Sequence, residues 1–180
     1  MGPQEFEHVI AAAAEVTSQD EFVVIGSQAI LGSIVQPPAS LLQSLEADIY
    51  PLRDPAAADL IDGALGDGSP FHLAFGYYAH GVDPETAKAP KGWQDRLVRR
   101  TIPPRVASNR TAVAWCLEAH DLVLSKCVAG RERDWEYAAN AVTAEIVRPD
   151  VLLARIRDLP VDDALRDHVE QMLQALINDQ

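Results

Sequence analysis

Glu46 and Asp48 lie two positions apart in the segment 45–51, where apolar and polar side chains alternate. Side chains two positions apart on a β-strand share one face, with Cα atoms about 6.6 Å apart. Two carboxylates placed in this way can converge on a hard divalent cation such as Mg²⁺. The alternative interpretation is a strand whose outer face is simply exposed to water.

Gly26 and Ser27 have the position of a phosphate-binding turn. They follow the apolar run 22–25, which is typical of a buried strand, and they precede a segment with helical spacing. Free backbone amides and the positive end of the helix dipole attract anions at such a turn. Alternatively, the glycine makes the turn tight and the serine caps the helix.

Lys126 is the only charged residue within 122–129. A cation in an apolar helix is costly unless an anionic group lies opposite it, although the stem can also pack while the ammonium reaches solvent. Asp134 follows eight residues later, between apolar residues and the basic pair Arg131 and Arg133. It is either a third functional acid or the ion-pair partner of one of these arginines.

Charge is distributed unevenly along the chain. The 180 residues carry a net charge of -12 at pH 7, which alone argues against nonspecific binding of nucleic acid. Residues 88–110, here called the basic strip, nevertheless hold a single acid and seven basic residues: Lys88, Lys91, Arg96, Arg99, Arg100, Arg105 and Arg110. The basic strip fits a wall that contacts polyphosphate or RNA, and the alternative is a solvated loop that balances the acids around it.

The hydropathy pattern predicts the elements that position these residues. Helices are expected over 4–17, 28–35 and 55–65, and strands over 22–25, 45–51 and 93–98. Within 45–51, the alternation predicts that Leu45, Ala47 and Ile49 face the core and that Glu46, Asp48 and Tyr50 face the other way. From Thr111 onward the pattern is helical, and three of the expected helices have the N-caps Asp121, Asp150 and Asp162.

The two cysteines, Cys116 and Cys127, are expected to be reduced and buried. Their spacing in a helical region excludes a disulfide within one straight helix. No apolar run approaches the roughly 18 residues of a membrane-spanning helix, and the N-terminal segment is acidic rather than a basic leader. A cytoplasmic protein without membrane contacts is therefore expected.

A strand, Gly-Ser, a helix and a second strand with two alternate carboxylates form the pattern of the DNA polymerase β-like nucleotidyltransferase superfamily. This chain resembles that superfamily in IGSQAILGS and SLEADIYP. The segment LEAHDLVLSKCVAGRERDWEYAA resembles the AbiEii-like minimal nucleotidyltransferases, which include MenT-type toxins of bacterial toxin-antitoxin systems. GYYAHGVDPETAKAPKGWQDRLV resembles an uncharacterised bacterial branch of the same group.

The resemblance implies an α+β fold in which helices flank a mixed β-sheet. It implies a nucleotidyltransferase core over 1–110 and a C-terminal helical lobe over 111–180 that completes the active-site cleft. Glu46 and Asp48 would bind Mg²⁺ or Mn²⁺. The nucleoside triphosphate would contact Gly26, Ser27, Arg131 and Arg133.

Three further roles follow from the resemblance alone. Lys126 would contact a phosphate or neutralise charge in the transition state, and Asp134 would match the downstream acid of the family. Ser44 occupies a position that is phosphorylated to silence some of the toxins. The first metal acid is Glu46 where the superfamily usually has Asp, and a third strand-borne carboxylate cannot be assigned.

The function implied is transfer of a nucleoside monophosphate from a nucleoside triphosphate to a hydroxyl of RNA, such as tRNA, or of protein. The enzyme would act as a toxin restrained by an antitoxin protein. The alternative is a catalytically degenerate module of the same fold that binds a nucleotide or docks a partner. Contacts to the acceptor are expected from Arg96, Trp93 and Tyr77. The five histidines show no metal-ligand spacing, and only His72 is a candidate base.

Overall fold

The computed structural model describes residues 1–104 and 110–179. Its β-sheet has five strands: β1 (Glu21–Ile25), β2 (Glu46–Pro51), β3 (Tyr78–Gly81), β4 (Val98–Ile102) and β5 (Ala112–Cys116). The α-helices are α1 (Pro3–Thr17), α2 (Ile30–Ser33), α3 (Ala58–Leu65), α4 (Pro70–Phe75), α5 (Ala119–Ala129), α6 (Glu132–Thr143), α7 (Pro149–Ile156) and α8 (Asp163–Asn178). Short 3-10 helices are η1 (Ser27–Ala29), η2 (Ala39–Leu41), η3 (Pro55–Ala57), η4 (Pro84–Thr86) and η5 (Trp93–Arg96).

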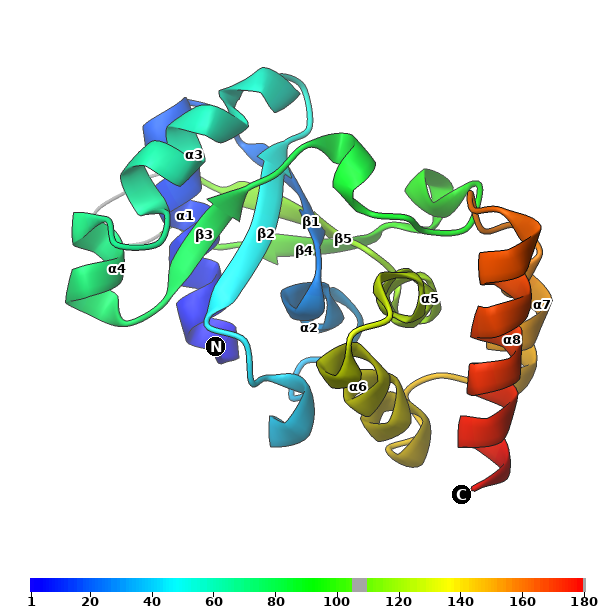
Figure 1. The fold of residues 1–180 in the computed structure, drawn as a ribbon. Helices are drawn as coiled ribbons and strands as arrows, with labels where there is room; N and C mark the ends of the chain where they lie inside the picture. The colour runs from blue at the N-terminus through cyan, green and yellow to red at the C-terminus, as the bar shows by residue number, and fades with distance from the viewer. Residues whose placement is uncertain (105–109, 180) are drawn as a thin grey trace.

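The sheet is mixed, with the strand order β3-β2-β1-β5-β4 (Figure 1). The central strand β1 runs antiparallel to β2 and parallel to β5. β3 joins the free edge of β2 in parallel, and β4 pairs with β5 in an antiparallel hairpin. The expected α+β fold, with helices flanking a mixed sheet, is confirmed.

One face of the sheet is buried by α1 and α2. Strand β2 contributes Ala47 and Ile49 to it, and both are fully buried, as the alternation predicts. Leu45, by contrast, precedes the strand and is 54% exposed, so its expected core position is wrong. Tyr50 shares the opposite face with the acids but is only 6% exposed, because the segment after β3 covers it.

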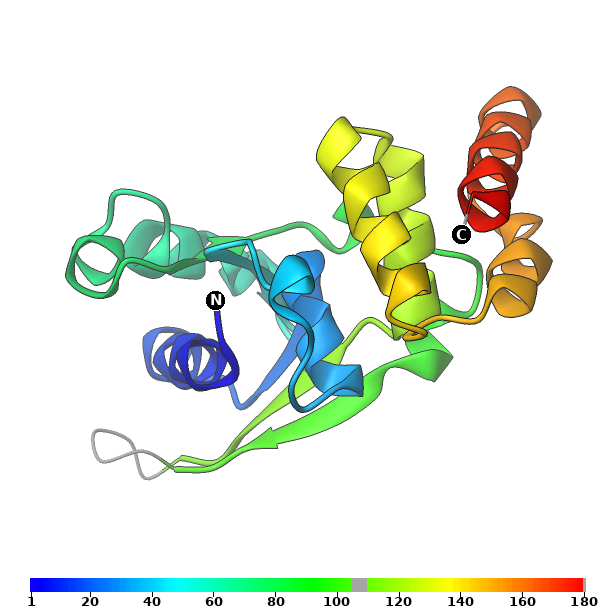
Figure 2. The same ribbon diagram turned by 90° about the horizontal axis from the view of Figure 1, so that it is seen from below.

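Helices α5 to α8 form a helical lobe beside the sheet (Figure 2). The expected N-cap Asp162 of α8 is confirmed, since its side chain accepts a hydrogen bond from the Leu165 amide. α5 is instead capped by Glu118, and Asp121 lies inside its first turn, fully buried. The N-cap of α7 is Arg148 rather than Asp150. No helix among the described residues is long and apolar enough to cross a bilayer.

Two expected elements are wrong. Residues 93–96 form a 3-10 helix, and the strand begins only at Val98. The segment 112–116, expected to be helical, is strand β5. A short apolar run has no period that separates strand from helix, and here parallel pairing with β1 decides. The division into 1–110 and 111–180 stays a prediction, and the helices of the second part begin at Ala119.

The two cysteines are confirmed as free, buried thiols. Cys116 lies in β5 rather than in a helix, and Cys127 lies in α5. Burial raises the pKa of each thiol to about 12. Neither thiol is therefore ionised near neutral pH, and both act as small core side chains.

Candidate functional site

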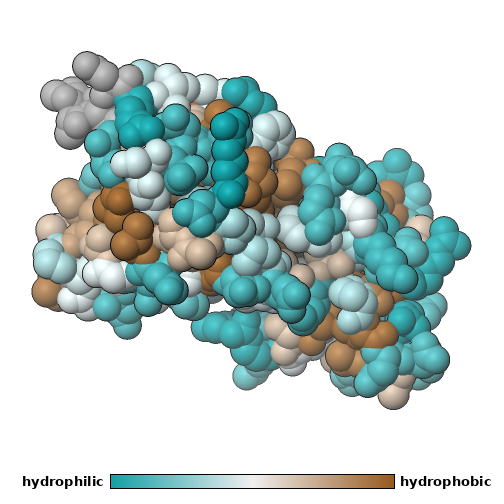
Figure 3. Space-filling view, turned by 90° about the horizontal axis from the view of Figure 1, so that it is seen from above, coloured by the Kyte–Doolittle hydropathy of each residue, from teal (hydrophilic) through white to brown (hydrophobic). Residues whose placement is uncertain are grey.

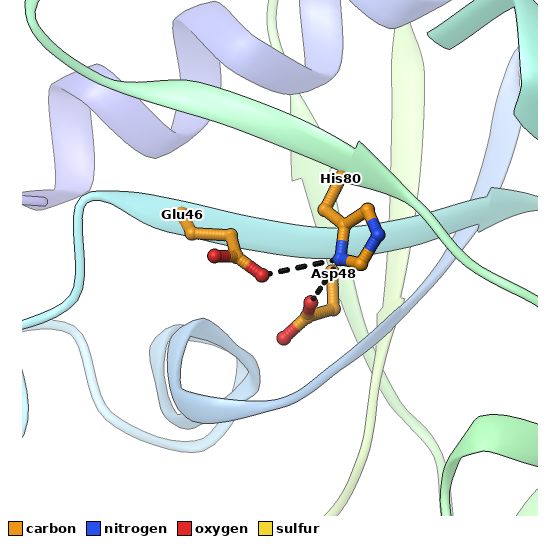
Figure 4. Close-up of side chains that lie close together, drawn as sticks. All are labelled: Glu46, Asp48 and His80. Atoms are coloured by element: carbon orange, nitrogen blue, oxygen red, sulfur yellow. Dashed lines mark hydrogen bonds and ion pairs between the residues drawn. The ribbon is translucent and has the colours of Figure 1, made fainter. Parts of the chain in front are cut away.

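The two acids of β2 leave the strand on one side and meet a histidine of β3 (Figure 4). In the parallel register, Glu46 pairs with Tyr78 and Asp48 with His80. The Nδ1 atom of His80 lies 3.2 Å from Glu46 Oε1 and 3.3 Å from Asp48 Oδ1. One ligand atom from each of these three residues lies within 4.8 Å of the others. We call Glu46, Asp48 and His80 the acid-histidine cluster.

His80 is the site residue that sequence reasoning missed. The sequence shows no metal-ligand spacing because the ligands come from two strands about 30 residues apart, which pairing alone brings together. One feature of the sequence could have indicated His80: Tyr78 and His80 are two positions apart, so they share a face if the segment is a strand. Tyr78 completes the arrangement by donating a hydrogen bond from its hydroxyl to Glu46 Oε2 at 2.8 Å.

The pKa values of all three residues of the acid-histidine cluster are shifted, and that of Asp48 is shifted most clearly. Burial, together with the hydrogen bond and charge of Glu46, raises the pKa of Asp48 to about 7. Partial burial of Glu46 is outweighed by its hydrogen bonds from Asp48 and Tyr78 and by His80, so its pKa is lowered. The two carboxylates outweigh the burial of His80 and raise its pKa. Asp48 thus takes up a proton near neutral pH that a cation could replace.

Gly26 leaves the space that the Asp48 carboxylate fills. A Cβ atom at this position would lie 1.9 Å from Asp48 Oδ2, and the backbone has a φ of +65°. Glycine is the residue that tolerates both conditions. The chain turns here from β1 into η1 and α2, so the expected helix over 28–35 is shorter and begins as a 3-10 helix.

Lys126 lies across from the acids and is held by Asp134. Its Nζ atom is 3.1 Å from Asp134 Oδ1, and it lies 4.7 Å from the ring centre of Tyr137. The Nε atom of Arg131 is 2.6 Å from Asp134 Oδ2. Asp134 is fully buried and forms ion pairs with both cations. Its role as a functional acid stays a prediction. Burial lowers the pKa of Lys126 although Asp134 opposes this.

A cavity of about 730 Å³ lies between the acid-histidine cluster and these cations, and we call it the main cavity. The expected site residues that line it are Gly26, Ser27, Ser44, Glu46, Asp48, Lys126, Arg131 and Arg133. His80 and Lys88 line it as well. Acids from the sheet therefore face cations from α5 and α6 across one space of a size that suits a small-molecule ligand.

Most arginines of the basic strip lie outside the main cavity. Each of three is paired with an acid outside the main cavity: Arg96 with Asp121 (2.7 Å), Arg100 with Glu7 (2.8 Å) and Arg110 with Asp20 (2.8 Å). Arg105 lies outside the described residues. The charges of these three arginines are therefore neutralised locally, and none of the three lines the main cavity. Contact of the basic strip with polyphosphate or RNA stays a prediction.

The expected acceptor contacts are not brought to the main cavity. Trp93 is 7% exposed and lines a second, smaller cavity. Tyr77 has its hydroxyl 2.7 Å from His8 Nδ1 in an aromatic cluster with α1 and α4. His72 lies at α4, where its Nδ1 is 2.9 Å from Asp67 Oδ1. His72 approaches the site only through its ring contact with Tyr78, at 4.7 Å between ring centres.

Comparison with known proteins gives one family. Searches of curated proteins and of solved structures return no match. A family described as nucleotidyltransferases of unknown function, DUF6036, matches residues 4–172. That range contains both acids, His80 and the cations of α5 and α6. The chain therefore belongs to this family of nucleotidyltransferases.

Proposed function

We propose that this protein is a metal-dependent nucleotidyltransferase that moves a nucleoside monophosphate from a nucleoside triphosphate to an acceptor hydroxyl. The observation that carries the proposal is the placing of the acid-histidine cluster opposite Lys126 and Arg131 across the main cavity. Carboxylates that bind a cation on one wall and fixed cations on the other complement a metal-bound polyphosphate. The family match agrees in reaction class.

The donor set fits a divalent metal ion. Glu46 and Asp48 offer hard oxygen ligands, and His80 offers a nitrogen. Carboxylates alone suit Mg²⁺, whereas a mixed set of oxygen and imidazole ligands moves affinity toward Mn²⁺. We therefore place the metal at these three residues and expect Mn²⁺ to bind more tightly than Mg²⁺. A bound metal ion would neutralise charge on the triphosphate during transfer.

The site residues other than the metal ligands would bind and orient the triphosphate. Lys126 and Arg131 are fixed by Asp134, so they meet a phosphate without reorganising. In the transfer, the acceptor oxygen forms a bond to the α-phosphorus and loses its proton to water. The bond from the α-phosphorus to the bridging oxygen breaks, and pyrophosphate leaves with its electron pair. Asp134 serves as a positioning residue, and Gly26 and Ser27 line the phosphate side.

The choice of acceptor, the toxin role and the regulation that we propose rest on the resemblance to the AbiEii-like and MenT-type enzymes. It favours an acceptor hydroxyl of RNA or protein and a toxin restrained by an antitoxin protein. It also favours regulation at Ser44, which lines the main cavity and exchanges hydrogen bonds with the backbone of Glu46. A phosphate on Ser44 would add negative charge beside two carboxylates and oppose binding of a triphosphate.

A second candidate function is nucleotide binding without transfer. The observation that favours it is that β3 places His80, and not a third strand-borne carboxylate, beside Asp48. Among the described residues, the acids that line the main cavity are the cluster pair and Glu136 on α6. With His80 as a ligand, the cavity would lack a dedicated base for the acceptor.

The test is calorimetric titration of each nucleoside triphosphate with Mn²⁺ or Mg²⁺, for the wild type and for the double variant E46A/D48A. We expect metal-dependent binding that the double variant loses. The same samples are then incubated with an α-phosphate-labelled triphosphate and total RNA or protein. Label transfer supports the enzyme, binding without pyrophosphate release supports the second candidate, and absence of any binding contradicts both.

A further inference from the structure

A second cavity, of about 440 Å³, adjoins the main cavity. Ala87 and Lys88 line both, so the two spaces share a wall at the segment that follows β3. Polar and apolar side chains both line the second cavity, and the lining includes the two aromatic residues Tyr50 and Trp93 and also Pro160. Its volume suits a ligand of roughly nucleotide size.

The rim of the second cavity is cationic. Lys88 and Lys91 both line it and are exposed, and Glu85 is the one acid among its lining residues. Within residues 1–104 and 110–179, neither lysine side chain has an ion-pair partner. In a chain of net charge -12, two unpaired cations at one cavity mark a local site for an anion.

The wall that carries these lysines is held in place. Arg96 donates hydrogen bonds to the carbonyl oxygens of Pro90 and Lys91 and to the buried carboxylate of Asp121 on α5. The amide of Lys91 donates to the carbonyl of Asp158 at 2.9 Å. The segment between β3 and β4 therefore spans from the sheet to the helical lobe (Figure 1). It is shaped before any ligand binds, which lowers the entropic cost of binding.

The face of the molecule that Figure 3 shows is mainly hydrophilic, with separate smaller hydrophobic patches. Aromatic side chains with two lysines beside them complement a nucleotide, whose base is flat and whose phosphate is anionic. An acidic peptide would engage the lysines but would leave the aromatic side chains without a flat partner.

We propose that the second cavity binds a nucleotide unit of an RNA acceptor and so presents a strand to the main cavity. This inference rests on the proposed function, because it assigns the acceptor of the same transfer. Lys91 contacts the strand without lining the main cavity, whereas Lys88 lies between the two. Lys91 is therefore the residue that separates acceptor binding from nucleotide binding.

The experiment compares the wild type with Lys91→Glu and with the matched control Arg148→Glu. Arg148 is exposed, lines neither cavity, and undergoes the same change of charge. The probes are a fluorescein-labelled single-stranded RNA of about ten nucleotides, followed by anisotropy without triphosphate, and AMP, followed by calorimetry. Binding of triphosphate with Mn²⁺ is measured in parallel.

We expect Lys91→Glu to weaken RNA binding about tenfold and to lower the slope of log affinity against log salt by about 1. Triphosphate binding stays unchanged, and Arg148→Glu behaves as the wild type. AMP binding that depends on Lys91, without RNA binding, would assign the second cavity to a free nucleotide and contradict binding of an RNA strand. Equal RNA binding by the wild type and Lys91→Glu, or none, overturns the inference. Failure of triphosphate binding alone would contradict the proposed function instead.

Discussion

Replacing Asp48 by Asn should stabilise the metal-free protein at pH 8. The pKa of this carboxyl is raised from 3.8 to about 7, mainly by burial and then by Glu46. Since the folded state holds the proton more tightly than the unfolded state, stability is lost as the pH rises from about 4 to about 7. Asparagine keeps the shape of the side chain and never carries this charge.

The magnitude follows from the shift. About three pKa units at about 1.4 kcal/mol each give an upper limit of about 4 kcal/mol. The contact with Glu46 offsets part of this free-energy cost, because it lowers the pKa of Glu46 and the two carboxyls share a proton. We therefore expect Asp48→Asn to raise the free energy of unfolding by about 2 kcal/mol at pH 8 and by much less at pH 5.

The assay is urea denaturation in the presence of a chelator at both pH values. Asp95→Asn is the matched control, because Asp95 is exposed, and within the part of the chain that the structure describes it has no ion pair. It removes one negative charge from the same acidic protein without relieving a buried one. A gain at pH 8 that Asp95→Asn reproduces, or no gain at all, would refute the destabilisation that the raised pKa of Asp48 implies.

Three further outcomes are expected. Gly26→Ala should abolish Mn²⁺ binding in calorimetry, because its Cβ would displace Asp48 Oδ2, whereas Gly68→Ala, at a φ of +73° with open space around it, should keep binding. Lys126→Met should lower the free energy of unfolding by about 1–2 kcal/mol in urea denaturation, because Asp134 stays buried with one partner fewer. The same variant should weaken triphosphate binding in calorimetry. Mn²⁺ affinity, measured by calorimetry at pH 8, 7 and 6, should fall about tenfold per pH unit below pH 7, because Asp48 takes up a proton there. An affinity that does not change with pH would contradict Asp48 as a metal ligand.

The part of the site that could be predicted from sequence is the part set by local spacing. The acid pair and the Gly-Ser turn depend on residues a few positions apart, and strand geometry fixes how they point. The burial of Ala47 and Ile49 follows from the same alternation.

The part that could not be predicted depends on pairing between distant segments. His80 reaches the acids only because β3 joins β2 in parallel, and no local pattern states which edge a short strand will choose. The segment 112–116 becomes a strand for the same reason, through β1. The partners of the basic strip are equally distant, so a run of charges that is continuous in sequence is dispersed in space.

The parallel pairing of β1 with β5 also constrains the order in which the protein can assemble. It joins residues 21–24 to 113–116, so a loop of about 90 residues must close before the middle of the sheet exists. The cations of α5 and α6 follow β5 in the chain and are synthesised well after the acids of β2. A chain still emerging from the ribosome therefore presents the acids of β2 without the cations of α5 and α6.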